Sequence, residues 1–280
     1  MELDLVDVFG SVALSGNPLA VVRGGEGLSD AQMLRLTQWL GFSETTFLLP
    51  PADPAADYKV RIFYPAGELP FAGHPTLGSA YAWLAAGGVP REQGKLVQEC
   101  GVGLVDVRQQ AADRLAFRAP ALTRSGPLSE TEKADAARVA GVAPDAIVEA
   151  VHIANGPNWQ LLRLATAEQV LAASPAARAP IGTDVGLAAP AAPGSGVDWE
   201  VRAFFANQHG TLCEDLVTGS FNAGLAMHLF ATGLATGSYT AAQGRQTGAD
   251  GRIELAQETD GSVWVAGRCN MVASGAHLRV

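Results

Sequence analysis

The chain has 280 residues, a formal net charge of −9, 48% hydrophobic residues and only 17% charged residues. A charged fraction below the roughly 25% of an average soluble domain predicts a large buried core and excludes a disordered chain. The acidic balance argues against nucleic acid and anionic membrane as partners. The N-terminal sequence MELDLVDVF is acidic where a signal peptide would be basic, so the cytoplasm is the expected location.

The first third of the chain predicts several strands and one capped helix. Val6, Val8 and the apolar run at residues 19–22 indicate strands. Ser29 and Gln32 form a capping box that starts a helix, and Gly41 ends it. The other expected elements are strands at residues 48–49, 59–64, 96–98 and 103–108, and a second capped helix beginning at residues 166–169.

Two stretches, residues 69–90 and 216–244, contain no Asp, Glu, Lys or Arg. Glycines, prolines and polar side chains interrupt both stretches, which argues against membrane spans. A helix that is apolar on every side and lies outside a membrane is enclosed by protein. We therefore expect two fully buried helices, at residues 75–86 and 221–232.

The two uncharged stretches also resemble each other. Gly73 matches Gly219 at a spacing of 146 residues, and Glu68 matches Glu214 at the same spacing. This constant spacing predicts a duplicated domain, with halves at residues 1–118 and 128–280. The expected fold class is α+β, and each half is expected to wrap a β-barrel or roll around one buried helix.

The starts of the two buried helices are candidate binding sites. Pro75 fits the first helical position, which places His74 at the N-cap, and Gly219 and Ser220 begin the second helix. Free backbone N–H groups and a partial positive charge at a helix start suit a carboxylate. If a pseudo-two-fold axis relates the halves, both starts can face one cleft. The alternative is that His74 and Ser220 only cap their helices.

Two carboxylates are candidates for chemistry. Glu44 is expected on an apolar strand face, where desolvation raises a carboxyl pKa and suits proton transfer. The alternative is an exposed strand glutamate. Asp215 lies five residues before Ser220 and can accept from a substrate hydroxyl or amine, whereas Glu214 is expected to face solvent.

No cofactor or metal site is readable. The three cysteines are scattered, and no Cys/His pair has metal-ligand spacing. The sequence also lacks a dinucleotide fingerprint, a phosphate loop and a nucleophile elbow. We therefore expect a reaction without cofactor or metal.

At these residues the chain resembles the phenazine-biosynthesis PhzF-like family, which has the diaminopimelate epimerase-like fold. The longest matching stretch is also the most specific, and the matches follow the family order over nearly the whole chain. They are VDVF at 6–9, SGNPLAVV at 15–22, SETTFLL at 43–49, ELPFAGHPTLG at 68–78, EDLVTGS at 214–220 and QG at 243–244.

The resemblance implies two similar domains with the active site between them, a cofactor-independent isomerase and a homodimer. The family's catalytic acid/base glutamate falls on Glu44. Its histidine, aspartate and serine fall on His74, Asp215 and Ser220. The glycines whose backbone contacts the substrate in the family fall on Gly73 and Gly219.

The chain departs from the family pattern at several positions. Leu216 replaces a proline, and Ala249 stands where the family often has an arginine. Ala72 and Thr218 occupy positions where related racemases carry catalytic cysteines, so two-thiol racemisation is not expected.

Together these observations predict an isomerase that moves a proton within a small cyclic or unsaturated carboxylic acid. One alternative is a racemase or epimerase with a single carboxylate base. The other is a protein that binds a small acid without turnover.

Overall fold

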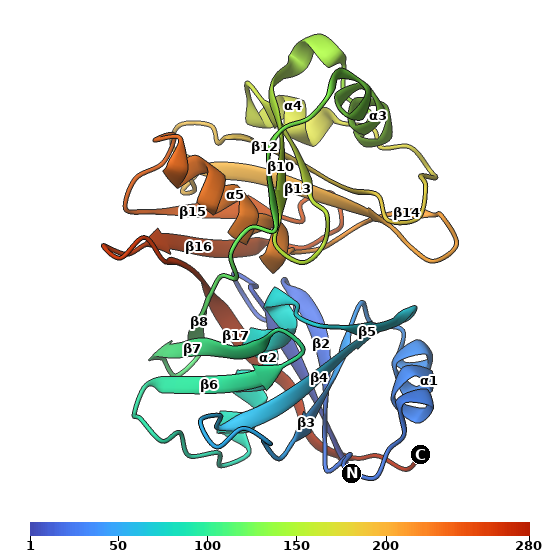
Figure 1. The fold of residues 1–280 in the computed structure, drawn as a ribbon, viewed down its shortest axis with the longest axis vertical. Coiled ribbons are helices and arrows are strands. Elements are labelled where there is room, and N and C mark those ends of the chain that lie inside the picture. Colours follow the sequence, from blue (N-terminus) through green and yellow to red (C-terminus); the bar gives the residue numbers. More distant parts are fainter. The chain divides into compact units, whose positions relative to one another are not determined.

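The computed structural model describes residues 1–280, which form two compact units (Figure 1). Unit 1 comprises Met1–Arg118 and Ala266–Val280, and unit 2 comprises Ala119–Val265. Each unit is a mixed α+β fold rich in strands, which confirms the predicted fold class.

The strands of unit 1 pair in a closed circuit. Neighbours around it are β1 with β2, then β3, β4, β6, β7 and β8, and finally β17, which pairs with both β8 and β1. The elements are β1 (Glu2–Val8), β2 (Asn17–Arg23), α1 (Asp30–Leu40), β3 (Thr45–Leu49), β4 (Tyr58–Tyr64), β5 (Gly67–Leu69), α2 (Gly73–Ala85), β6 (Lys95–Cys100), β7 (Gly103–Ala111), β8 (Arg114–Arg118) and β17 (Val263–His277).

Helix α2 is the central helix of unit 1 and contacts six of these strands. A Cβ atom added at Gly78 would lie 2.5 Å from Leu19 Cδ2, so this glycine allows α2 to pack closely against β2. Helix α1 contacts β3 and β4, with Met33 and Leu36 packed against Phe47 and Phe63. The predicted capping box of Ser29 and the left-handed end at Gly41 are both present on α1.

Unit 2 contains a second run of paired strands, from β9 through β10, β11, β12, β13 and β15 to β16. Its elements are β9 (Arg124–Pro127), α3 (Glu130–Ala140), a 3-10 turn (Pro144–Ala146), β10 (Ile147–Ala154), β11 (Gln160–Leu164), α4 (Ala167–Ala172), β12 (Asp184–Pro190), β13 (Trp199–Ala206), β14 (Leu212–Glu214), α5 (Gly219–Ala231), β15 (Ser238–Gln243) and β16 (Gly251–Gln257).

Helix α5 contacts β10 and β16, and Gly224 makes the close approach to β10 possible. A Cβ atom at Gly224 would lie 2.4 Å from the carbonyl oxygen of Ile153. Helices α3 and α4 cover another part of the sheet and share an apolar cluster with β11–β13. The predicted capping box of Thr166 and Gln169 starts α4.

The two units follow the same order of elements. In unit 1, α1 joins parallel β2 and β3, and α2 lies between parallel β4 and β6. In unit 2, α4 joins parallel β11 and β12, and α5 lies between parallel β13 and β15. This shared order agrees with the predicted duplication, which stays a prediction.

Two predicted boundaries need correction. The second half does not run to residue 280, because Ala266–Val280 belongs to unit 1. This segment pairs with β1, from Glu2 opposite His277 to Val8 opposite Cys269, and supplies the strand that closes the circuit. The second unit also begins at residue 119 rather than 128.

The two central helices each begin two residues earlier than predicted, at Gly73 and Gly219, so their N-caps are Ala72 and Thr218. Neither helix is fully buried along its length, because Trp83 and Leu84 of α2 and Met227 and His228 of α5 are partly exposed. No helix is long and apolar enough to cross a membrane.

Candidate active site

The first group of candidate residues lies at the start of α2. His74 occupies its first turn rather than the N-cap, and its Nε2 lies 3.5 Å from Glu44 Oε2. Glu44 immediately precedes β3 and leads the chain from the end of α1 into the sheet. The structure thus brings together the two residues of unit 1 that were predicted to act in catalysis, Glu44 and His74.

The close packing of α2 explains this contact. One turn after His74, Gly78 brings the helix against β2, and Ser79 donates a hydrogen bond of 2.9 Å to Thr46 on β3. Thr46 lies two residues after Glu44, so the same packing holds the end of Glu44 near the imidazole.

His74 is neutral at physiological pH. Its side chain is only 5% exposed, and burial lowers the pKa of His74 to about 3. The neighbouring pair is therefore a glutamate and an uncharged imidazole, not a pair of opposite charges. A neutral imidazole can donate a hydrogen bond from one ring nitrogen and accept at the other.

The start of α2 also presents backbone donors. Because Pro75 has no N–H, the helix offers the N–H groups of Gly73 and His74 in its first turn, next to Glu44. Gly73 is buried at this point, as a residue that contacts substrate through its backbone would be.

Asn17 and Ser43 lie close to this group. The Ser43 hydroxyl donates to Asn17 Oδ1 at 3.4 Å, which connects the start of β2 to the residue before Glu44. Asp7 holds the preceding loop, because its carboxylate accepts from the backbone N–H of Gly16 at 2.8 Å. Desolvation by burial raises the pKa of Asp7, although the backbone donors oppose that effect.

The second group of candidate residues lies before and at the start of α5 in unit 2. Asp215 and Ser220 flank the N-cap residue Thr218, whose hydroxyl donates to Asp215 Oδ2 at 2.7 Å rather than capping the helix. Ser220 is in the first turn and is 8% exposed. Gly219, the first helical residue, is also buried.

Gln243, at the end of β15, fixes this arrangement. Its Oε1 accepts from the Thr218 backbone N–H at 3.0 Å and from Asn222 Nδ2 at 2.9 Å. The Asn222 amide is itself oriented, because Nδ2 also donates to the Thr218 carbonyl. Gln243 Nε2 must then face the Thr218 hydroxyl, to which it donates at 2.8 Å.

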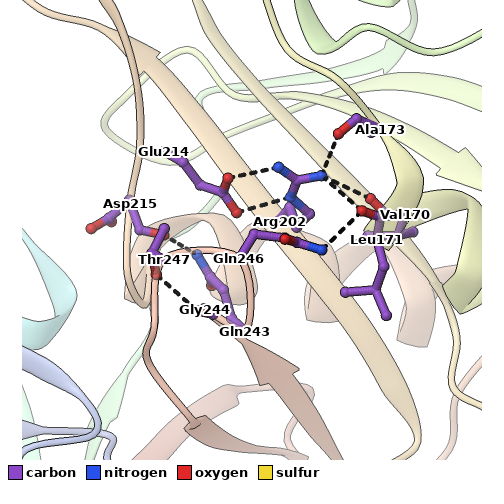
Figure 2. Close-up of polar contacts among 10 residues, drawn as sticks. All are labelled: Val170, Leu171, Ala173, Arg202, Glu214, Asp215, Gln243, Gly244, Gln246 and Thr247. Carbon is purple, nitrogen blue, oxygen red and sulfur yellow. Dashed lines mark hydrogen bonds and ion pairs between the residues drawn. The ribbon is translucent and has the colours of Figure 1, made fainter.

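These bonds define the direction of the hydroxyl proton. Thr218 Oγ1 accepts a hydrogen bond from Gln243 Nε2, so the hydroxyl proton of Thr218 points to Asp215. The Asp215 carboxylate is therefore the acceptor of the last hydrogen bond in this chain of three residues. Gln243 Nε2 also donates to the Asp215 carbonyl oxygen, as Figure 2 shows. The sequence indicated Gln243 only through a family motif, and did not assign it this role.

Glu214 does not face solvent, contrary to the prediction. Arg202 binds both of its carboxylate oxygens, at 2.9 and 2.7 Å, and the side chain of Glu214 is 13% exposed (Figure 2). The same guanidinium donates to carbonyl oxygens at the end of α4, including that of Ala173 at 2.7 Å. This buried ion pair fixes β14, the strand that leads into Asp215.

Sequence reasoning also missed Trp159. Its indole N–H donates to Ser220 Oγ at 2.9 Å, and its ring packs edge to face against Phe221. The signal available in the sequence was its place directly after Asn155-Gly156-Pro157-Asn158, a segment similar to Ser15-Gly16-Asn17-Pro18 in the first half.

The comparisons with known proteins identify the family of this chain. The model of the family described as "Phenazine biosynthesis-like protein" matches residues 6–275. Trans-2,3-dihydro-3-hydroxyanthranilate isomerase of Pseudomonas fluorescens is 33% identical over 80% of this chain and 78% of its own. "Antisense-enhancing sequence 1" of Schizosaccharomyces pombe is 34% identical over 59% of this chain, and the match spans 58% of that protein.

Solved structures show the same fold. A PhzF family protein from Bacillus anthracis has a TM-score of 0.83 at 20% identity and covers 100% of this chain and 99% of its own. A probable proline racemase from Agrobacterium radiobacter has a TM-score of 0.61 at 16% identity, covering 99% and 93% of the two chains. The chain therefore belongs to the phenazine biosynthesis-like protein family and is an isomerase of that family.

Proposed function

We propose that this isomerase works without a cofactor and moves a proton between two carbons of a small cyclic or unsaturated carboxylic acid. Glu44 takes the proton from one carbon and returns it to another. The observation that carries the proposal is the 3.5 Å approach of Glu44 to the buried, neutral His74 at the start of a helix.

His74 has the properties of a group that polarises a substrate. Being uncharged, it does not stabilise Glu44 as a fixed ion pair, so Glu44 can hold or release a proton without breaking a salt bridge with this residue. The imidazole can instead exchange a hydrogen bond with the glutamate or with a substrate hydroxyl or amine.

Asp215 and Ser220, in unit 2, are proposed to bind substrate. Asp215, kept as an acceptor by the Thr218 hydroxyl, would receive an N–H or O–H of the substrate. Ser220 and the backbone N–H group of Gly219 would bind a substrate carboxylate. The absence of cysteine at Ala72 and Thr218 supports a single carboxylate base over two thiols.

The name of the Pseudomonas relative supplies a test substrate, trans-2,3-dihydro-3-hydroxyanthranilate. Incubation in heavy water should yield an isomer of it that carries deuterium at the carbon that receives the proton. Deuterium at the original carbon with inverted configuration would instead identify an epimerase. Binding of this and other cyclic amino acids without any deuterium exchange or product would contradict the proposal and favour a binding protein.

A further inference from the structure

Ser220 is a buried hydroxyl whose hydrogen bonding is incomplete. Its Oγ accepts one hydrogen bond, from the indole Nε1 of Trp159 at 2.9 Å. An indole N–H is only ever a donor, so the serine oxygen must be the acceptor in this contact. The hydroxyl proton of Ser220 is therefore left for some other acceptor.

Nothing in residues 1–280 accepts that proton. The side chain of Asn155 also contacts Ser220, because its Nδ2 donates to the Ser220 carbonyl at 3.0 Å, but its Oδ1 has no hydrogen-bond partner. Both residues are more than nine-tenths buried. A buried polar group without a partner destabilises the fold, so a group of this kind needs an explanation such as a bound ligand.

The surroundings of Trp159 fix its indole N–H as the donor to Ser220 Oγ. Its side chain is 3% exposed, and its ring meets Phe221 edge to face at a centroid distance of 5.4 Å. Its carbonyl oxygen accepts from the Ile153 N–H at 3.0 Å, which fixes the backbone beside α5. The indole therefore cannot turn away to leave the serine oxygen available to a donor from a ligand.

We infer that Trp159 is a positioning residue that directs the hydroxyl proton of Ser220 to a substrate carboxylate. The Ser220 hydroxyl and the free backbone N–H groups of the first turn of α5 are then a set of donors for a ligand. Such a set selects a carboxylate and rejects a neutral amide, whose N–H₂ would meet another donor. The inference rests on the proposed carboxylate-binding role of Ser220.

The test measures binding and does not depend on turnover. Anthranilate and the uncharged anthranilamide are titrated into the ¹⁵N-labelled protein, and the indole N–H signals are followed by NMR. The Trp159 signal is assigned from its loss in Trp159→Phe. We expect anthranilate to shift this signal and anthranilamide to leave it unchanged.

A double-mutant cycle separates positioning from a merely structural role. Trp159→Phe and Ser220→Ala should each weaken anthranilate binding about tenfold, the effect of one hydrogen bond to a charged group. If Trp159 acts through Ser220, the double variant should bind no more weakly than Ser220→Ala alone. Ser220→Thr, which keeps the hydroxyl, should stay within about threefold of the wild type.

Trp264→Phe is the matched control, because the Trp264 indole also donates to a serine hydroxyl, that of Ser262 at 3.2 Å. It should leave anthranilate binding unchanged. Additive losses in the double variant, or no binding of anthranilate to the wild type at millimolar concentration, would overturn the inference. If Trp159→Phe does not fold, the loss of the anthranilate-induced indole shift in Ser220→Ala, with retention in Ser220→Thr, decides the question.

The outcomes also separate this inference from the proposed function. Coupling between Trp159 and Ser220 without any isomerisation in heavy water would contradict the proposed function only. Isomerisation with independent effects of the two residues would contradict only the role of Trp159.

Discussion

Arg202 donates hydrogen bonds to both carboxylate oxygens of Glu214, and Arg61 does the same to Glu68 in the other unit. In each unit the guanidinium also lies over a phenylalanine ring two residues further along its strand, at 5.0 Å from Phe204 and 5.1 Å from Phe63. The sequence Val-Arg-x-Phe occurs at residues 60–63 and 201–204, and both copies make the same set of contacts.

The two arginine–glutamate pairs should contribute differently to the free energy of unfolding. The Arg202–Glu214 side chains are 5% and 13% exposed, whereas those of Arg61 and Glu68 are 21% and 42% exposed. Arg202→Met should lower the free energy of unfolding by about 3–5 kcal/mol, because it leaves a buried carboxylate unpaired. Arg61→Met should cost about 1 kcal/mol or less. Urea unfolding of both variants checks this, and equal losses would contradict it.

Glu44→Gln should abolish most of the proton transfer. The amide keeps the shape of the side chain but cannot accept a proton, so we expect a loss of about 10²–10⁴-fold in kcat with little change in substrate affinity. Glu92→Gln, at an exposed glutamate paired with Lys95, is the control. A Glu44→Gln enzyme as fast as this control would show that another residue moves the proton.

His74→Ala should affect both substrate binding and rate. The imidazole is proposed to touch the substrate in the ground state as well as in the transition state, so KM should rise and kcat should fall. Steady-state kinetics of this variant beside Glu44→Gln measure the difference. A rise in KM with unchanged kcat would limit His74 to binding.

His74 should also make the fold sensitive to acid. Because burial lowers the pKa of His74 to about 3, the unfolded chain binds this proton more tightly than the native one. Its contribution therefore reduces stability as pH falls from about 6.5 towards 3, by up to about 1.4 kcal/mol for each pH unit. Between pH 7 and 5, the wild type should lose about 2 kcal/mol more than His74→Gln in urea unfolding; parallel curves would contradict this.

Thr218→Val should impair Asp215 without loss of the fold. The change removes the hydroxyl that donates to the Asp215 carboxylate but keeps the branched shape. If Asp215 needs this donor to stay oriented, kcat/KM should fall about ten- to a hundredfold, and Thr218→Ser should restore most of it. Equal activity of the valine and serine variants would show that the hydroxyl is dispensable.

The sequence by itself determined the local features of this protein. The capping boxes at Ser29 and Thr166 depend on residues three positions apart, and the buried central helices follow from long stretches without charge. Glu44 and His74 could also be identified as candidates from the sequence, because both residues lie in family motifs.

Only the tertiary structure decided the features that join distant segments. Residues 266–280 belong with the first unit because β17 pairs with β1, a pairing that no local pattern encodes. Likewise, Glu214 is buried because Arg202 reaches it from a neighbouring strand, and Ser220 is polarised by Trp159, 61 residues earlier in the chain. Helix caps and apolar runs are determined by residues close together in the sequence. The charge state of His74 instead depends on its burial away from water. The direction of the Ser220 hydroxyl proton depends on the donor that the fold brings within hydrogen-bond distance.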